Sequence, residues 1–310
     1  MDNYTNNYAD NFTGNRLDYY KPSGRAPAGG IVLTILLGII CGVILSAIYS
    51  VINYINPYVY LNVLLTFGFS ILTGKILSFG IRKFQIRNIA VSIFISLVVF
   101  VIAYIAHWYF YLAVTLTDWE TNSIFHFAIV AEYFGLLLQY PVDTLGLIHE
   151  INDAGWSLSG RSTGSGGLPI HGILLTIIWF LEAVILVFFI ITTPLNVVRT
   201  PYSERQNRWM EKLPDRLIPF IQEPEAFKHA LGINDFRALT LPLTEVELNL
   251  PSGDQRYASV SVYTDQADAY ITVANTFLKV KKKKKQKSEN VIVKHLRVPL
   301  GVLKDIGQQQ

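Results

Sequence analysis

The chain has 310 residues, of which 51% are hydrophobic and only 16% are charged, and its formal net charge is +3. Because about 25% of the residues of an ordinary soluble domain are charged, this composition argues against a wholly soluble protein. The single cysteine, Cys41, excludes a disulfide within the chain and a metal site built on several thiolates.

The first 29 residues are polar and rich in asparagine and tyrosine, with proline and glycine towards their end. They have neither helical nor strand periodicity, so we expect residues 1–29 to form a disordered tail. The tail is too long and polar for the start of a signal peptide, and the apolar run after it is too long for the core of one. We therefore expect an uncleaved first helix.

Four apolar runs follow, over about residues 31–52, 58–79, 89–116 and 171–193. About 20 apolar residues are enough for a helix to cross some 30 Å of hydrocarbon. Asn56-Pro57 separates the first two runs, Gly80 is expected to end the second, and Pro194 to end the fourth. The sequence predicts four transmembrane helices within a domain of residues 30–194.

The charges between these runs predict the orientation of the chain. Residues 80–88 contain Arg82, Lys83 and Arg87 and no acidic residue, whereas the charged residues of 117–170 are six acidic residues and a single arginine. Basic residues favour the cytosolic side of a membrane. We expect both termini in the cytosol, the loop 117–170 outside, and a multi-pass protein of the plasma or inner membrane.

The outer loop contains two further apolar patterns. Ile124–Leu138 is too short to span a membrane, and we expect an interfacial or a re-entrant helix there. Pro141 opens a second amphipathic helix. The glycine- and serine-rich stretch Ser159–Gly167 is typical of a flexible connection.

Residues 195–310 have the composition of a soluble domain. Apolar residues at helical spacing over Trp209–Phe220 predict a helix near the membrane, and Pro224–Leu231 predicts a short second one. Residues 258–263, 270–280 and 291–298 have strand patterns. The fold class is an α-helical membrane protein with a small β-rich (α+β) C-terminal cytosolic domain.

Small residues form ridges in the first two runs. Small side chains at four-residue steps let helix backbones approach closely in lipid. The ridges predict helix packing, either inside one bundle or at a dimer seam. Their members are Thr34, Gly38, Gly42, Ser46, Ser50, Ser70, Gly74 and Ser78.

Few polar side chains that can ionise fall inside or at the ends of the predicted spans. Lys75 lies near the cytosolic end of its helix, where its long side chain can reach the surface. Glu182 lies mid-helix, where a carboxylate is costly, so it is either a functional group or a structural partner of Lys75. His107 and His171 lie towards the outer side, where histidines could bind zinc, but the sequence lacks zinc-ligand spacing such as HExxH and we expect interfacial or capping roles and no metal site.

A lysine run lies between the last two strand patterns. We expect a solvated hairpin loop, with contact to lipid head groups as the alternative and no nucleic-acid binding, because aromatic residues do not alternate with the lysines. The run consists of Lys279, Lys281, Lys282, Lys283, Lys284, Lys285 and Lys287.

No nucleotide, haem or hydrolase motif occurs, and we expect no cofactor. The favoured function is a non-catalytic membrane scaffold or assembly component, whose partners are the lipid bilayer and either further copies of itself or another membrane protein. The alternatives are a small ion or solute transporter or channel subunit that uses Glu182, and a membrane-embedded enzyme that uses the outer histidines and glutamates.

Overall fold

A computed structural model describes residues 17–56, 58–157, 169–243, 254–281 and 284–306. The chain divides into two compact units. The helical unit comprises residues 22–199, and the sheet unit comprises residues 1–21 together with residues 200–310. The two are described separately.

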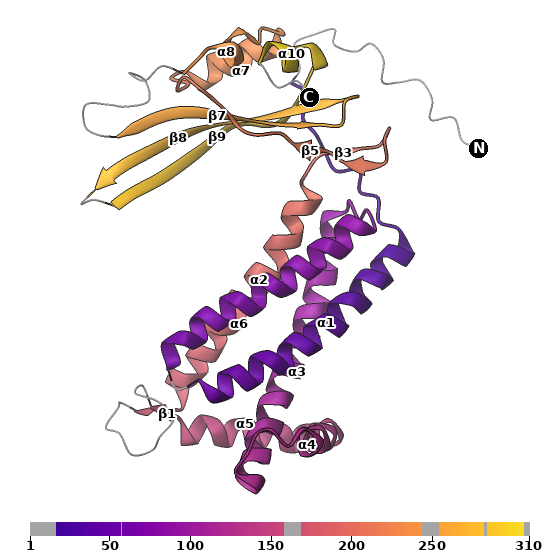
Figure 1. Cartoon of the computed structure of the whole chain (residues 1–310), viewed down its shortest axis with the longest axis vertical. Helices are drawn as coiled ribbons and strands as arrows, with labels where there is room; N and C mark the ends of the chain where they lie inside the picture. Colours follow the sequence, from indigo (N-terminus) through magenta and orange to yellow (C-terminus); the bar gives the residue numbers. More distant parts are fainter. Residues whose placement is uncertain (1–16, 57, 158–168, 244–253, 282–283, 307–310) are drawn as a thin grey trace. The chain divides into compact units, whose positions relative to one another are not determined.

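The helical unit is built on α1 (Ala28–Ile55), α2 (Val59–Lys83), α3 (Ile89–Thr121) and α6 (Ile173–Val198). These four helices are long and apolar enough to cross a membrane. Helix α1 packs on α2 and α3, and α6 packs on the same two helices (Figure 1). The long apolar runs of the sequence therefore predict the helices correctly.

Two of these helices continue past the residues expected to end them. Helix α2 passes Gly80 and ends at Lys83, and a Cβ atom at Gly80 would lie 2.8 Å from Cγ2 of Thr34. The glycine therefore allows α1 to approach rather than ending α2. Helix α6 continues through Pro194, which is buried inside it, to Val198. A proline removes only one of the helix hydrogen bonds, and packing holds the last turn in place.

Two short helices, α4 (Phe127–Gln139) and α5 (Pro141–Ala154), connect α3 to α6. Leu137 of α4 packs against Leu112 and Ala113 of α3. Large apolar side chains of both helices stay exposed, and the choice between an interfacial and a re-entrant helix stays a prediction. The antiparallel pair β1 (Trp156–Ser157) and β2 (Pro169–Ile170) follows, and the whole glycine- and serine-rich connection, residues 159–167, lies outside the described residues. Among the apolar residues of α4 and α5, the most exposed are Phe127, Val142 and Leu145.

The sheet unit contains a five-stranded antiparallel sheet. Strands β5 (Glu211–Lys212), β7 (Gln255–Thr264), β8 (Ala269–Lys281) and β9 (Lys284–Val298) follow in that order, and β6 (Arg216–Ile218) also pairs with β7. Strands β3 (Tyr202–Ser203) and β4 (Arg208–Trp209) form a separate pair. The three expected strands lie within β7, β8 and β9.

The helix expected over residues 209–220 is wrong. That segment forms β4, β5 and β6, and the backbone N–H of Leu213 donates to the carbonyl of Val262 at 2.9 Å. Pro214 has no N–H and disfavours a helix there, whereas an edge strand tolerates it. Pairing with β7 thus overrides the helical spacing of the apolar residues.

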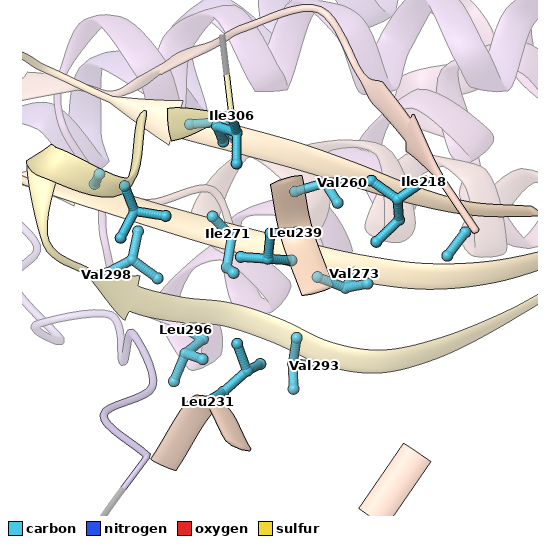
Figure 2. Close-up of a cluster of buried hydrophobic side chains, with 14 of the residues drawn as sticks. Ile218, Leu231, Leu239, Val260, Ile271, Val273, Val293, Leu296, Val298 and Ile306 are labelled. Atoms are coloured by element: carbon cyan, nitrogen blue, oxygen red, sulfur yellow. The ribbon is translucent and has the colours of Figure 1, made fainter. Parts of the chain in front are cut away.

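One face of the sheet is covered by α7 (Pro224–Gly232), α8 (Arg237–Thr240) and α10 (Leu300–Asp305) (Figure 1). Leu231 and Leu239 of these helices pack on Val260, Ile271 and Val273 of the strands, and all five are at most 3% exposed (Figure 2). Each fully buried aliphatic side chain stabilises the fold by about 1.5–3 kcal/mol. This cluster is the core of the sheet unit.

Asn275 is a buried polar residue on β8 and is 3% exposed. Its side-chain amide donates to the carbonyl of Ile221 at 2.8 Å, and its Oδ1 accepts from the N–H of Ile221 at 3.1 Å. Both backbone groups of Ile221 are satisfied in this way, as buried polar groups require. Asn275 therefore fixes the segment between β6 and α7 to the sheet.

Residues just before α1 add a further short segment to the sheet. The N–H of Tyr20 donates to the carbonyl of His295, and the N–H of Arg297 donates to the carbonyl of Asp18, both at 2.8 Å. Tyr19 forms an antiparallel bridge with Leu296 of β9. The expectation of a disordered tail is therefore wrong for these residues, whose backbone is held by β9, and residues 1–16 lie outside the described part of the chain.

Candidate functional site

Glu182 lies on α6 in a polar cluster of the helical unit. Its carboxylate accepts a hydrogen bond from the hydroxyl of Tyr49 on α1. That hydroxyl lies 2.8 Å from Oγ1 of Thr66 on α2, and Thr66 in turn donates to the carbonyl of Asn62 at 2.7 Å. Three helices therefore bring one acid and two hydroxyls together.

The ring of Tyr49 packs against the rings of Phe69 and His107. It stacks on Phe69 with ring centroids 4.9 Å apart, and its centroid is 4.6 Å from that of His107 on α3. Tyr49 is 4% exposed and Thr66 is 2% exposed. This packing positions the phenol for its contact with Glu182.

His107 is joined to α1 by a second set of contacts. Oγ of Ser50 lies 2.9 Å from Nδ1 of His107 and donates to the His107 carbonyl at 2.9 Å. His107 is 5% exposed. One turn along, Oγ of Ser46 donates to the carbonyl of Ala103 at 2.7 Å. Polar side chains of the α1 ridge therefore join α1 to α3.

The glycines of the two ridges lie at close helix contacts. A Cβ atom at Gly38 would lie 2.7 Å from both Leu77 and Val99, and one at Gly74 would lie 2.8 Å from Cβ of Thr193. Thr34, Gly42 and Ser70 are buried, and Ser78 is partly buried. These ridge residues therefore lie at contacts between helices of the helical unit, and a dimer seam stays a prediction.

The other polar residues expected in or near the spans lie elsewhere. The side chain of Lys75 is exposed on α2, and that of His171 is exposed just before α6. Among the described residues no ion pair joins Lys75 to Glu182. No group of three histidine, cysteine, aspartate or glutamate residues within the described ranges could hold a metal ion.

The lysine run lies where β8 turns into β9. Lys281 pairs with Lys284 across the hairpin, and Lys279 and Lys287 are exposed. Lys282 and Lys283 lie outside the described residues, and the side chains of Lys281, Lys284 and Lys285 are not described either. The hairpin is present, but Lys279 and Lys281 lie on β8 and Lys284, Lys285 and Lys287 lie on β9 rather than in a loop, and lipid contact stays a prediction.

Sequence reasoning did not identify Tyr49 and Thr66 as partners of Glu182. Tyr49 lies three residues after Ser46 and directly before Ser50. A tyrosine hydroxyl beside two serines inside an apolar run could have indicated that this part of the helix makes polar contacts. The sequence gives the depth of each residue in its helix but not the rotation of α1 against α6. Comparison of the chain with protein-family models, curated proteins and solved structures gives no match.

Proposed function

We propose that this protein is a multi-pass membrane component that holds its sheet unit at the cytosolic face and works through contacts with other proteins, without catalysing a reaction. The observation that carries this proposal is that the sheet unit is assembled from both flanks of the helical unit. Asp18 and Tyr20 precede α1, and they hydrogen-bond to β9, which follows α6. Two chain connections therefore lead from the sheet unit to the helices, which suits a protein whose role is to hold a domain in place.

The same pairing supports a topology with both flanks on one side of the membrane. Segments that share backbone hydrogen bonds have to lie in one compartment, so the number of crossings between them is even. The basic residues of loop 80–88 favour the cytosol for that compartment. Reporter fusions after Gly80, Thr117 and Arg199 test this topology. We expect cytosolic signals after Gly80 and Arg199 and an outside signal after Thr117, and an outside signal after Arg199 would contradict it.

The interaction itself is tested by cross-linking and co-purification of the full chain from native membranes in mild detergent. Val291 on β9 and Ile233, directly after α7, are 49% and 54% exposed. We expect a reproducible set of partners with the wild type, and reduced recovery with Val291→Glu or Ile233→Glu at unchanged thermal stability. Val291→Thr, which keeps the shape, is the matched control.

The proposal fails if the wild type enriches no protein over an equally expressed four-span control. It also fails if liposomes containing the purified protein carry an ion flux that Glu182→Gln abolishes. The second outcome would identify the helical unit as a transporter.

A further inference from the structure

Strands β8 and β9 form a long hairpin, and β9 is the last strand in the order of the sheet (Figure 1). On the side of β9 away from β8, the segment Asp18–Tyr20 pairs with residues 295–297. In the part of the chain that the structure describes, no other segment pairs with β9 on that side. The stretch 286–291, named the β9 edge, is therefore an unpaired strand edge.

A break in the strand register separates the paired part of β9 from the β9 edge. The pairing of β8 with β9 shifts on both sides of Val273 and is then regular from Val291 to Lys284. Bulges bend a strand and interrupt its ladder, so the pairing of Asp18–Tyr20 stops at this break. Along a regular antiparallel edge, every second residue points both its N–H and its C=O away from the sheet. The β9 edge thus offers hydrogen-bond donors and acceptors at the spacing of a further strand.

The sequence around the β9 edge is strongly basic. Residues 279–294 contain eight lysines and a single acidic residue, Glu289. Lys279 and Lys294 are exposed, and Lys287 lies 3.2 Å from Glu289. Like charges on facing strands destabilise a sheet, and opposite charges stabilise it. A second copy of β9 would bring two lysine-rich strands together, whereas an acidic strand gains from the same charges.

The backbone of the β9 edge distinguishes between the acidic ligands that lysines attract. Phosphate groups of lipids and nucleic acids carry acceptor oxygens, which pair with N–H groups but leave the outward carbonyls without a donor. An extended peptide supplies donors and acceptors alternately and satisfies both kinds of group. Val291 is 49% exposed and adds an apolar contact that suits a side chain rather than a phosphate. The combined features match a peptide strand.

We propose that the β9 edge binds an extended acidic segment of a partner protein, which joins the sheet as a further strand. Main-chain hydrogen bonds provide the affinity, and the residues of the segment that face Lys287 and Val291 provide the specificity. An acidic side chain suits the first position and an apolar one the second. This inference rests on the proposed function, because it specifies where the protein partner binds and what its chemistry is.

Amide hydrogen exchange of the full-length protein in neutral lipid discs tests the proposal. The probe is a synthetic peptide with blocked ends, in which glutamate alternates with threonine around one valine. We expect the peptide to slow exchange in residues 286–291 several-fold, because outward amides become hydrogen-bonded. The same peptide with every amide N-methylated keeps its charges but has no backbone donor, and it should give no protection. Equal protection by both peptides, or none by the first, would overturn the proposal.

A charge exchange between strand and peptide locates the contact. Lys287→Glu should weaken binding of the glutamate peptide by about threefold to tenfold and strengthen binding of a peptide with lysine in place of glutamate. Lys304 is exposed on α10, so Lys304→Glu makes the same charge change away from the β9 edge and is the matched control. Equal weakening by the two substitutions would refute the site. The exchange measurement on the wild type needs no variant, so a misfolded variant does not remove the test.

Other occupants of the β9 edge give different results. Protection of residues 286–291 by phosphatidylserine vesicles but not by the peptide would assign the edge to lipid, and protection that appears only on self-association would assign it to a second copy. Either result overturns the proposal. If partners are recovered equally with the wild type and with Lys287→Glu, this inference fails and the proposed function stands. Protection by the peptide without any recovered partner contradicts the proposed function alone.

Discussion

Gly74 on α2 lies so close to Thr193 on α6 that a Cβ atom at Gly74 would come within 2.8 Å of the Thr193 Cβ and 3.0 Å of the Phe189 carbonyl oxygen. Gly68, on the same helix, has no atom within 4 Å of the equivalent position. Gly74→Ala should therefore destabilise the helical unit by about 1–3 kcal/mol, because backbone atoms cannot move aside cheaply. Thermal unfolding in detergent measures the effect. Gly68→Ala should be neutral or slightly stabilising, and equal losses in the two variants would contradict close packing of α2 on α6.

The pairing of Tyr20 with the sheet gives a second prediction. Tyr20 contacts Tyr270 edge to face, with centroids 5.5 Å apart, whereas its neighbour Tyr19 is 37% exposed. Tyr20→Ala should cost about 1 kcal/mol and loosen the pairing, so that the Arg297 amide exchanges its hydrogen faster. Tyr19→Ala should leave that amide protected. If Arg297 exchanges equally fast in the wild type and in Tyr20→Ala, the ring of Tyr20 does not hold the segment.

Asn275 provides a test of the buried polar contact in the sheet unit. Asn275→Leu should destabilise the unit by about 2 kcal/mol or more, because both backbone groups of Ile221 lose their partner. Asn290 pairs with Asn275 across the strands but is exposed. Asn290→Ala is therefore the control and should change the unfolding midpoint in urea little. A larger shift for Asn290→Ala than for Asn275→Leu would refute this account.

His295 makes the stability of the sheet unit depend on pH. Burial, with a smaller effect from Lys294, lowers the pKa of His295 from 6.5 to about 4. Between these values the unfolded chain binds more protons than the folded one, so stability is highest above pH 6.5 and falls as the pH is lowered towards 4. The linked change is at most about 3 kcal/mol.

Urea unfolding followed across this pH range measures the dependence. His295 has a positive φ of 52°, and asparagine tolerates that conformation, so His295→Asn should remove most of the slope without straining the backbone. The pKa values of Asp215 and Asp265 are lowered from their ordinary value of 3.8, so these two groups change the stability only below about pH 3.8. The change between pH 4 and 6.5 is therefore assigned largely to His295. An unchanged slope in His295→Asn would show that another group is responsible.

The sequence predicts the long elements well because their signals are local. The uncharged run over residues 89–117 of α3 and the alternation of Ala258, Val260 and Val262 each indicate an element without knowledge of its neighbours. The prediction fails where a contact with another element determines the local structure. Gly80 is a contact for Thr34 rather than a helix stop, and Arg87, counted among the basic residues of the loop 80–88, is 1% exposed.

The candidate site follows the same division. Glu182 is identifiable as an acid deep in an apolar run, because its depth follows from the sequence alone. Its contact with Tyr49 depends on how α1 and α6 are rotated and is visible only in the assembled helices. Lys75, considered as a partner because it is the only basic residue within a predicted span, is exposed. Pairing across helices is the information that a single sequence lacks.

The segment Asp18–Tyr20 has a consequence for biosynthesis. It leaves the ribosome before any helix of the chain, yet its hydrogen-bond partners His295 and Arg297 lie on the last strand and are made almost at the end of translation. During synthesis the segment therefore has no partner strand, and it stays unpaired until β9 has been made. Completion of this pairing marks a chain that has been translated through its last strand.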